Sequence, residues 1–164
     1  KGLKIRTMNT QAMVDSFNAL GAQATPMSFG ELYSGLQQGV VDGAESDYVD
    51  LLIERFYEVT KHVSLTEHMY IPIALIMSKK IYDDLPPHVQ TAVWQGALAA
   101  IQIQRASLDM MTSKALEELN KMTDLKFYVV DKAPFRDAVR DVYQKYADQL
   151  GGAVVLDQVA KQWC

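Results

Sequence analysis

The sequence predicts an α/β protein with a short parallel sheet and one long bracing helix. In the amino-terminal part, β-prone runs alternate with helical patterns at short spacing, which is typical of right-handed β-α-β units. Between residues 87 and 122 apolar residues recur at helical spacing without a break, which predicts a single helix. Its length of about 50 Å exceeds the diameter of about 35 Å of a compact chain of this size. We therefore expect this helix to brace two lobes.

Turn and cap residues divide the amino-terminal part into its elements. Asn9 or Thr10 can cap a helix that Gly21 ends, and the spacing of Ser28 and Glu31 fits a capping box. The expected order is strand 3–8, helix 12–20, strand 22–25, helix 28–39, strand 40–45 and helix 50–57.

The pattern changes in the second part of the chain. Residues 63–68 and 70–77 are expected to form two strands or one long bent strand, and 70–77 is apolar on both faces, as in a buried central strand. Ser78 can cap a short helix. The expected order then continues with helix 78–85, the long helix 87–122, strand 127–130, and helices 134–150 and 154–163.

The composition is that of a folded, packed chain and restricts its partners. Of its 164 residues, 49% are hydrophobic and 22% charged, with a net charge of -4, which argues against nucleic acid or an anionic membrane as a partner. The single cysteine, Cys164, allows no intramolecular disulfide and no cysteine-based metal site. The chain opens on a strand pattern rather than a signal peptide, as a processed secreted protein would also do.

Polar and aromatic side chains gather where the first three expected strands end. Ligands of open parallel sheets bind beyond the carboxyl ends of the strands, and arginine grips a carboxylate with two parallel N–H donors. The pattern therefore predicts a site for a small polar anion. Three of the residues also have simpler explanations: Arg6 as a surface ion-pair partner, Phe29 as a core aromatic and Glu45 as a solvated loop acid. The candidate residues are Arg6, Asn9, Met27, Phe29, Glu45, Ser46 and Asp47.

Catalytic and metal-binding patterns are weak. His62, Glu67 and His68 could bind zinc, but their spacing fits no HExxH motif and the third histidine, His88, is distant. Ser28 lies outside any G-x-S-x-G pattern. No G-x-G-x-x-G or P-loop pattern occurs. We therefore expect no catalytic residue, no metal and no cofactor.

Four spaced segments resemble the carboxyl-terminal half of the DctP-type substrate-binding proteins of TRAP transporters. The resemblance extends over essentially the whole chain, and the combination of segments is specific. The segments are KGLKIR at 1–6, LGA at 20–22 with TPMSFGELY at 25–33, LQQGVVDGAE at 36–45, and FYEVTK at 56–61 with TEH at 66–68.

The resemblance implies a periplasmic-binding-protein-like lobe that is incomplete relative to the two-lobe fold of the family. On the family layout, residues 1–70 and 112–164 form the ligand-binding lobe, and 71–111 reach into the absent lobe. The resemblance also implies that Arg6 holds the ligand's carboxylate, that Phe29 forms a wall of the pocket, and that Asn9, Ser46 and His68 contact or line it. Ser46 stands where the family commonly has asparagine, which leaves the ligand open.

The resemblance further implies an extracytoplasmic solute-binding protein, in the periplasm or anchored at the outer face of the cell membrane. It would bind a C4-dicarboxylate, a sugar acid or a similar carboxylate for sodium-coupled uptake through the TRAP membrane permease subunits. The alternatives are a small α/β enzyme acting on an organic acid, with Arg6 orienting the substrate and His68 as general base, or an interaction module. Without the first half, apolar surface would be uncovered, so we also expect self-association.

Overall fold

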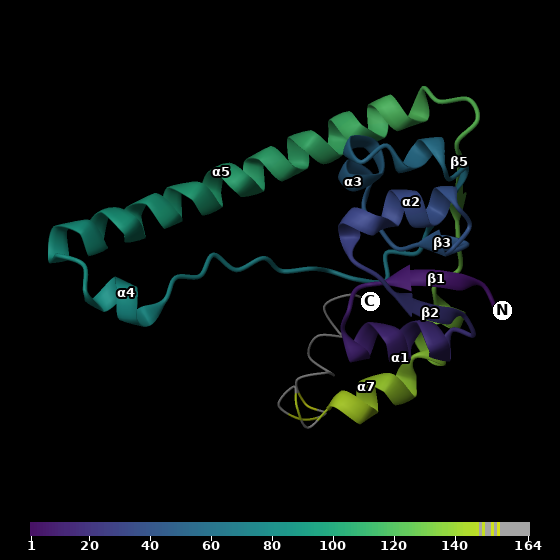
Figure 1. Ribbon diagram of the computed structural model, residues 1–164, viewed down its shortest axis with the longest axis horizontal. Helices are drawn as coiled ribbons and strands as arrows, with labels where there is room; N and C mark the ends of the chain where they lie inside the picture. Colours follow the sequence, from purple (N-terminus) through teal and green to yellow (C-terminus); the bar gives the residue numbers. More distant parts are fainter. Residues whose placement is uncertain (148, 150–151, 153, 155–164) are drawn as a thin grey trace. The chain divides into compact units, whose positions relative to one another are not determined.

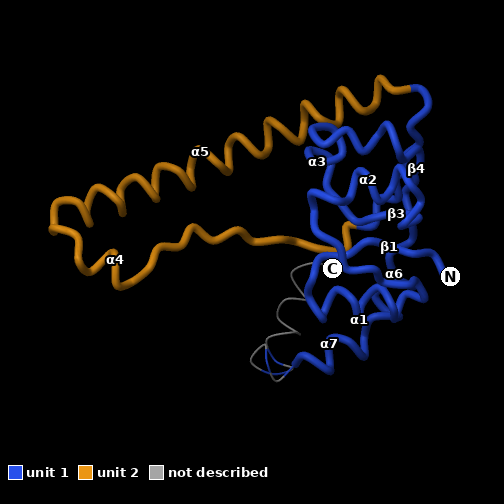
Figure 2. The backbone as a smooth tube through the Cα atoms, in the orientation of Figure 1, with its two compact units in different colours: residues 1–66, 123–164 blue, residues 67–122 orange. Residues whose placement is uncertain are grey.

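A computed structural model describes residues 1–147, 149, 152 and 154 of the chain. The chain divides into two compact units, residues 1–66 with 123–164 and residues 67–122 (Figure 2). Every strand of the described part belongs to the first unit. The long helix belongs to the second.

A three-stranded parallel sheet organises the first unit, as the sequence predicts. Its strands are β1 (Lys4–Thr7), β2 (Gln23–Pro26) and β3 (Gly43–Ala44), in the order β2-β1-β3. β3 is shorter than the predicted strand 40–45, because residues 38–42 form a turn. Asp42 still extends the pairing with β1. Its N–H donates to the Lys4 carbonyl at 2.8 Å, and its Oδ2 accepts from the Lys4 N–H at 2.8 Å.

The crossover helices lie on the two faces of this sheet. α1 (Gln11–Ala19) connects β1 to β2 and α2 (Leu32–Gln37) connects β2 to β3, so right-handed crossovers place them on opposite faces (Figure 1). Gly21 and Gly39 follow these helices with φ of +82° and +69°, a left-handed conformation that glycine adopts readily. The predicted helix ends are confirmed at both positions.

The predicted side-chain caps are wrong in detail. Thr10 occupies the N-cap of α1 and Ser28 precedes the 3₁₀ turn Phe29–Glu31, but neither side chain bonds to the helix backbone. Ser28 Oγ donates instead to Glu31 Oε2 at 2.6 Å. The capping-box spacing thus yields a contact between two side chains.

The hydrophobic core of the first unit comes mainly from the segment that follows β2. This segment contains α2, α3 (Tyr48–Ile53) and the 3₁₀ turn Phe56–Glu58. Tyr33 and Leu36 of α2 are half-buried. The buried apolar residues of this unit are Leu32, Val41, Leu51, Phe56 and Leu125.

A second, two-stranded parallel sheet joins segments that are far apart in the sequence. β4 (His62–Leu65) pairs with β5 (Lys126–Val129), close to the predicted strands at 63–68 and 127–130. The predicted helix 134–150 is two helices, α6 (Ala133–Ala138) and α7 (Arg140–Tyr146), which meet at Val139 with φ -97° and ψ 4°. The end predicted at 150 and most of helix 154–163 lie outside the described residues.

The second unit contains α4 (Lys79–Asp83) and α5 (Pro87–Asn120). α5 is one helix of 34 residues, which confirms the predicted continuous helix. Among its residues only Ala115 and Leu119 are buried, so most of its apolar stripe is exposed or half-buried.

The predicted strand 70–77 is wrong. Residues 66–78 form neither helix nor strand, and Ile73 and Ile76 are 86% and 87% exposed. A strand needs neighbours for its backbone N–H and C=O groups, and no strand of the described part pairs with this segment.

Candidate functional site

The carboxyl ends of β1, β2 and β3 meet at one edge of the sheet. In the strand register, Arg6 lies beside Thr25 of β2 and Ala44 of β3. The residues that follow those two strands, Met27 and Glu45, therefore flank Arg6. This is the edge at which the sequence predicts an anion site.

The Arg6 side chain is buried and held from both sides. The residue is 5% exposed. Its Nε donates to the Met27 carbonyl at 3.0 Å, and its Nη1 donates to Glu45 Oε1 at 3.3 Å. Its other N–H donors, including both on Nη2, have no partner within the described residues. The guanidinium is thus fixed in place, and the described residues use only part of its hydrogen-bonding capacity.

Phe29 forms an aromatic wall beside the guanidinium. Its ring centroid lies 5.8 Å from Arg6 Cζ, within the range of a cation–π interaction. The ring also packs edge-on against Phe56, with centroids 5.8 Å apart and an interplanar angle of 77°. Phe29 itself is 41% exposed, so it is not a core residue. One part of the Phe29 ring packs against Phe56, and another part remains accessible to solvent.

The Glu45 carboxyl is buried beside a single cation. Its side chain is 8% exposed and that of Arg6 is 6% exposed. Burial raises the pKa of the Glu45 carboxyl, Arg6 offsets part of this rise, and the nearby Asp50 and Asp47 add to it. Of the two candidate acids at this turn, Glu45 and Asp47, Glu45 forms the ion pair with Arg6, which contradicts its interpretation as a solvated loop acid.

Asp47 has a local structural role that the sequence interpretation missed. Its Oδ1 accepts a hydrogen bond from the Asp50 N–H at 2.8 Å, and Asp47 is the N-cap of α3. The signal for this cap is an aspartate directly before a helical apolar pattern. The carbonyl of Met27 was also missed, because a backbone acceptor leaves no trace in the residue types.

Within the described residues, no hydrogen bond or ion pair joins Arg6 to the candidates Asn9 and Ser46. Asn9 and Ser46 are exposed residues that follow β1 and β3. His68 belongs to the second unit. The structure therefore brings together Arg6, Met27, Phe29 and Glu45 out of the predicted set.

The predicted zinc alternative has no support in the geometry. His62 Nδ1 lies 2.9 Å from the Tyr128 hydroxyl, and the two rings stack with centroids 5.7 Å apart. Among the described residues, no three His, Cys, Asp or Glu side chains are grouped so that they could hold a metal ion. His62 thus links β4 to β5.

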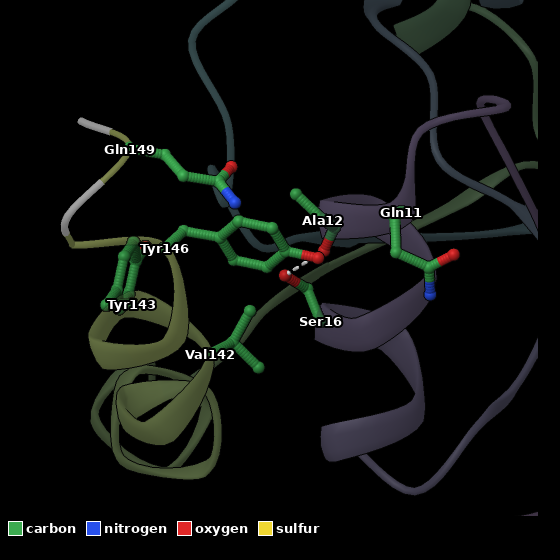
Figure 3. Close-up of a pocket in the computed structure, with 7 residues that line it drawn as sticks. All are labelled: Gln11, Ala12, Ser16, Val142, Tyr143, Tyr146 and Gln149. Carbon is green, nitrogen blue, oxygen red and sulfur yellow. Dashed lines mark hydrogen bonds between the residues drawn. The ribbon is translucent and has the colours of Figure 1, made fainter.

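A hollow of about 390 Å³ lies elsewhere in the first unit, between α1 and α7 (Figure 3). The Ser16 hydroxyl donates to the Ala12 carbonyl at 2.7 Å, and the Tyr146 hydroxyl donates to Asp15 at 2.7 Å, so these polar groups are already bonded. The hollow shares no residue with the Arg6 group. It is lined by Gln11, Ala12, Ser16, Val142, Tyr143, Tyr146 and Gln149.

Comparison with known proteins identifies relatives of the chain. The sequence profile described as "Bacterial extracellular solute-binding protein, family 7" (DctP) matches residues 1–149. A solute-binding protein of Verminephrobacter eiseniae is 34% identical over 159 residues, which cover 97% of this chain and 47% of that protein. The chain thus spans about half the length of the relatives it matches.

Solved structures of TRAP periplasmic solute-binding proteins are also similar to this chain. A TRAP periplasmic solute-binding protein from Pseudomonas putida F1 with bound D-glucuronate has a TM-score of 0.86 and 36% identity, over 91% of this chain and 48% of that one. One from Xanthobacter autotrophicus Py2 with bound β-D-galacturonate has a TM-score of 0.88 and 32% identity, over 98% of this chain and 53% of that one.

Among the described residues, none of the helices has the length and apolar character that a membrane-spanning helix needs.

Proposed function

Because the chain belongs to family 7 of the bacterial extracellular solute-binding proteins, we propose that it carries the carboxylate-anchoring part of a TRAP transporter binding protein. The protein would act in the periplasm or at the outer face of the cell membrane. It would deliver a small organic acid to the membrane permease subunits for sodium-coupled uptake. The proposal assigns binding to this chain and no catalysis.

The arrangement of Arg6 is the observation that carries the proposal. Met27 and Glu45 fix the guanidinium through Nε and Nη1, so the group is oriented before a ligand arrives. The donors that bond to no described residue, including both on Nη2, suit a carboxylate, whose two oxygens accept planar, directional hydrogen bonds. A fixed arginine loses little conformational freedom on binding, which favours affinity.

We propose a sugar acid, and a hexuronate in particular, as the ligand. Relatives of known structure hold D-glucuronate and β-D-galacturonate. The accessible part of the Phe29 ring supports this proposal, because small-molecule sites combine aromatic walls with a few oriented polar groups. Asn9, Ser46 and His68 are proposed to complete the ligand contacts. Residues 1–70 and 112–164 are proposed to form the ligand-binding lobe and 71–111 to extend into the other lobe.

Calorimetry on the full-length protein tests the role of Arg6. Hydrogen bonds to charged groups contribute about 1.5–3 kcal/mol each, and 1.4 kcal/mol corresponds to about tenfold in affinity. Arg6→Lys keeps the charge but cannot make two parallel bonds, so it should weaken binding of D-glucuronate or D-galacturonate by at least about tenfold. Arg6→Ala should weaken it further.

Arg140→Lys is the matched control, because the Arg140 side chain is exposed and pairs only with Asp137 within the described residues. It should leave affinity unchanged. Thermal unfolding of each variant verifies that the fold is kept. Affinity within a factor of about two for wild type and both Arg6 variants would remove Arg6 from the site. Consumption of the acid by the purified protein, followed by NMR, would favour the enzyme alternative.

A further inference from the structure

We propose that Glu45 couples ligand binding to proton uptake: its carboxylate neutralises Arg6 in the empty site, and it is protonated when an anion binds to Arg6. The inference rests on the proposed function of the Arg6 site. It assigns to Glu45 a role beyond holding the arginine in place.

The geometry of the ion pair is the first step. Arg6 and Glu45 are both nearly excluded from water, so each depends on the other for compensation of its charge. A single contact of 3.3 Å joins Nη1 to Oε1, and the donors on Nη2 remain for a second acceptor. A bound carboxylate would therefore share one guanidinium with Glu45. Two carboxylates that share one site cannot both ionise without a penalty, and the usual result is a raised pKa for one of them.

The charged groups around Glu45 determine whether Glu45 or the ligand's carboxylate takes up the proton. β1 contributes Arg6, the turn after β3 contributes Asp47, and α3 contributes Asp50. The segment after β2 contributes Met27 and Phe29, which carry no charge. Among the described residues, Arg6 is the one cation that supports ionisation of Glu45.

Binding of an anion removes that support. Burial and the two aspartates already raise the pKa of the Glu45 carboxyl in the empty site. Once the ligand's negative charge offsets that of Arg6, the same pKa must rise further, since burial and the two aspartates still act on Glu45. By linkage, binding then takes up a proton at pH values between the pKa of Glu45 in the empty site and that in the occupied site. In that window affinity increases as pH falls, by up to about tenfold per pH unit.

Calorimetry in two buffers of different ionisation enthalpy measures the number of protons taken up. The probe is D-glucuronate, titrated into the full-length protein from pH 5 to pH 8 in steps. Wild type should take up a fraction of a proton, and its affinity should fall as pH rises. Glu45→Gln keeps a hydrogen-bond acceptor for Arg6 but cannot titrate, so its proton uptake should vanish and its affinity should vary little with pH.

Two further variants make the test specific. Asp47→Asn removes a negative charge near Glu45 and should move the pH of maximal uptake to a lower value. Glu117→Gln removes an exposed acid of α5 and should behave as wild type. Equal proton uptake by wild type and Glu45→Gln overturns the inference and leaves the Arg6 site intact. Failure of wild type to bind either D-glucuronate or D-galacturonate overturns the proposed function, and the inference falls with it.

Discussion

The N-cap of α3 offers a sharp test of how the site turn is stabilised. Asp47 has an extended backbone, with φ -101° and ψ 176°, and its Oδ1 accepts from the Asp50 N–H at 2.8 Å. α3 has only six residues, so a large share of its backbone groups lies at its ends. Replacing an aspartate N-cap by alanine typically lowers stability by about 1 kcal/mol, within a range of about 0.5–2. We expect this loss for Asp47→Ala.

Asp47→Asn separates the hydrogen bond from the charge. Asparagine caps helices about as well as aspartate. The lost charge also removes repulsion, because Asp47 raises the pKa of both Asp50 and Glu45. This gain opposes the loss of a favourable charge at a helix N-terminus, which is worth about 0.3–1 kcal/mol. The stability of Asp47→Asn should therefore stay within about 0.5 kcal/mol of wild type.

Urea unfolding at pH 7, followed by circular dichroism, measures both differences. The unfolding midpoint should decrease for Asp47→Ala and remain close to wild type for Asp47→Asn, with the same slope in all three proteins. If asparagine destabilises as much as alanine, the charge and not the cap stabilises this turn. A loss below about 0.3 kcal/mol for alanine would show that the cap contributes nothing measurable.

Two further predictions concern acid sensitivity and self-association. Hydrogen bonds from Lys145, Gln11 and Tyr146 lower the pKa of Asp15 to about 2, so its contribution to stability should be complete above its ordinary pKa of 3.8 and disappear as pH falls through about 2. Acid unfolding of wild type and Asp15→Asn checks this, and a titration of Asp15 by NMR near its ordinary pKa would contradict it. The exposed apolar segment 70–77 should make this chain alone associate, because large exposed apolar patches favour association. Ile73→Lys at its centre places a charge in this patch and should reduce association. Light scattering at increasing concentration measures both, and a uniform monomer of the unmodified chain at high concentration would refute the idea.

Local patterns predicted the elements that depend on neighbouring residues. The strands at the start of the chain, the glycine-ended helices and the continuous α5 all follow from periodicity and turn residues within short windows. The proximity of Arg6 and Glu45 was also predictable, because parallel strands place their carboxyl ends at one edge. These features require no knowledge of distant contacts.

Features that depend on distant partners were not predictable. The pairing of β4 with β5 joins residues that are about sixty positions apart, and neither strand pattern specifies its partner. Residues 70–77 have the composition of a buried strand, but composition cannot supply neighbouring strands, and this segment is unpaired in the described part of the chain. The helix break at Val139 was also not predictable. The apolar periodicity continues through this residue, while its backbone leaves helical geometry.

The strand order explains why Arg6, and not another arginine, is suited to hold a ligand. β1 is the central strand, so its carboxyl end is flanked by the ends of β2 and β3. One neighbour supplies the Met27 carbonyl and the other supplies Glu45, so the guanidinium is held from two directions. An arginine at the end of an edge strand would have one such neighbour and could turn toward solvent. The order β2-β1-β3 thus converts an ordinary strand residue into an oriented donor with hydrogen bonds still to be made.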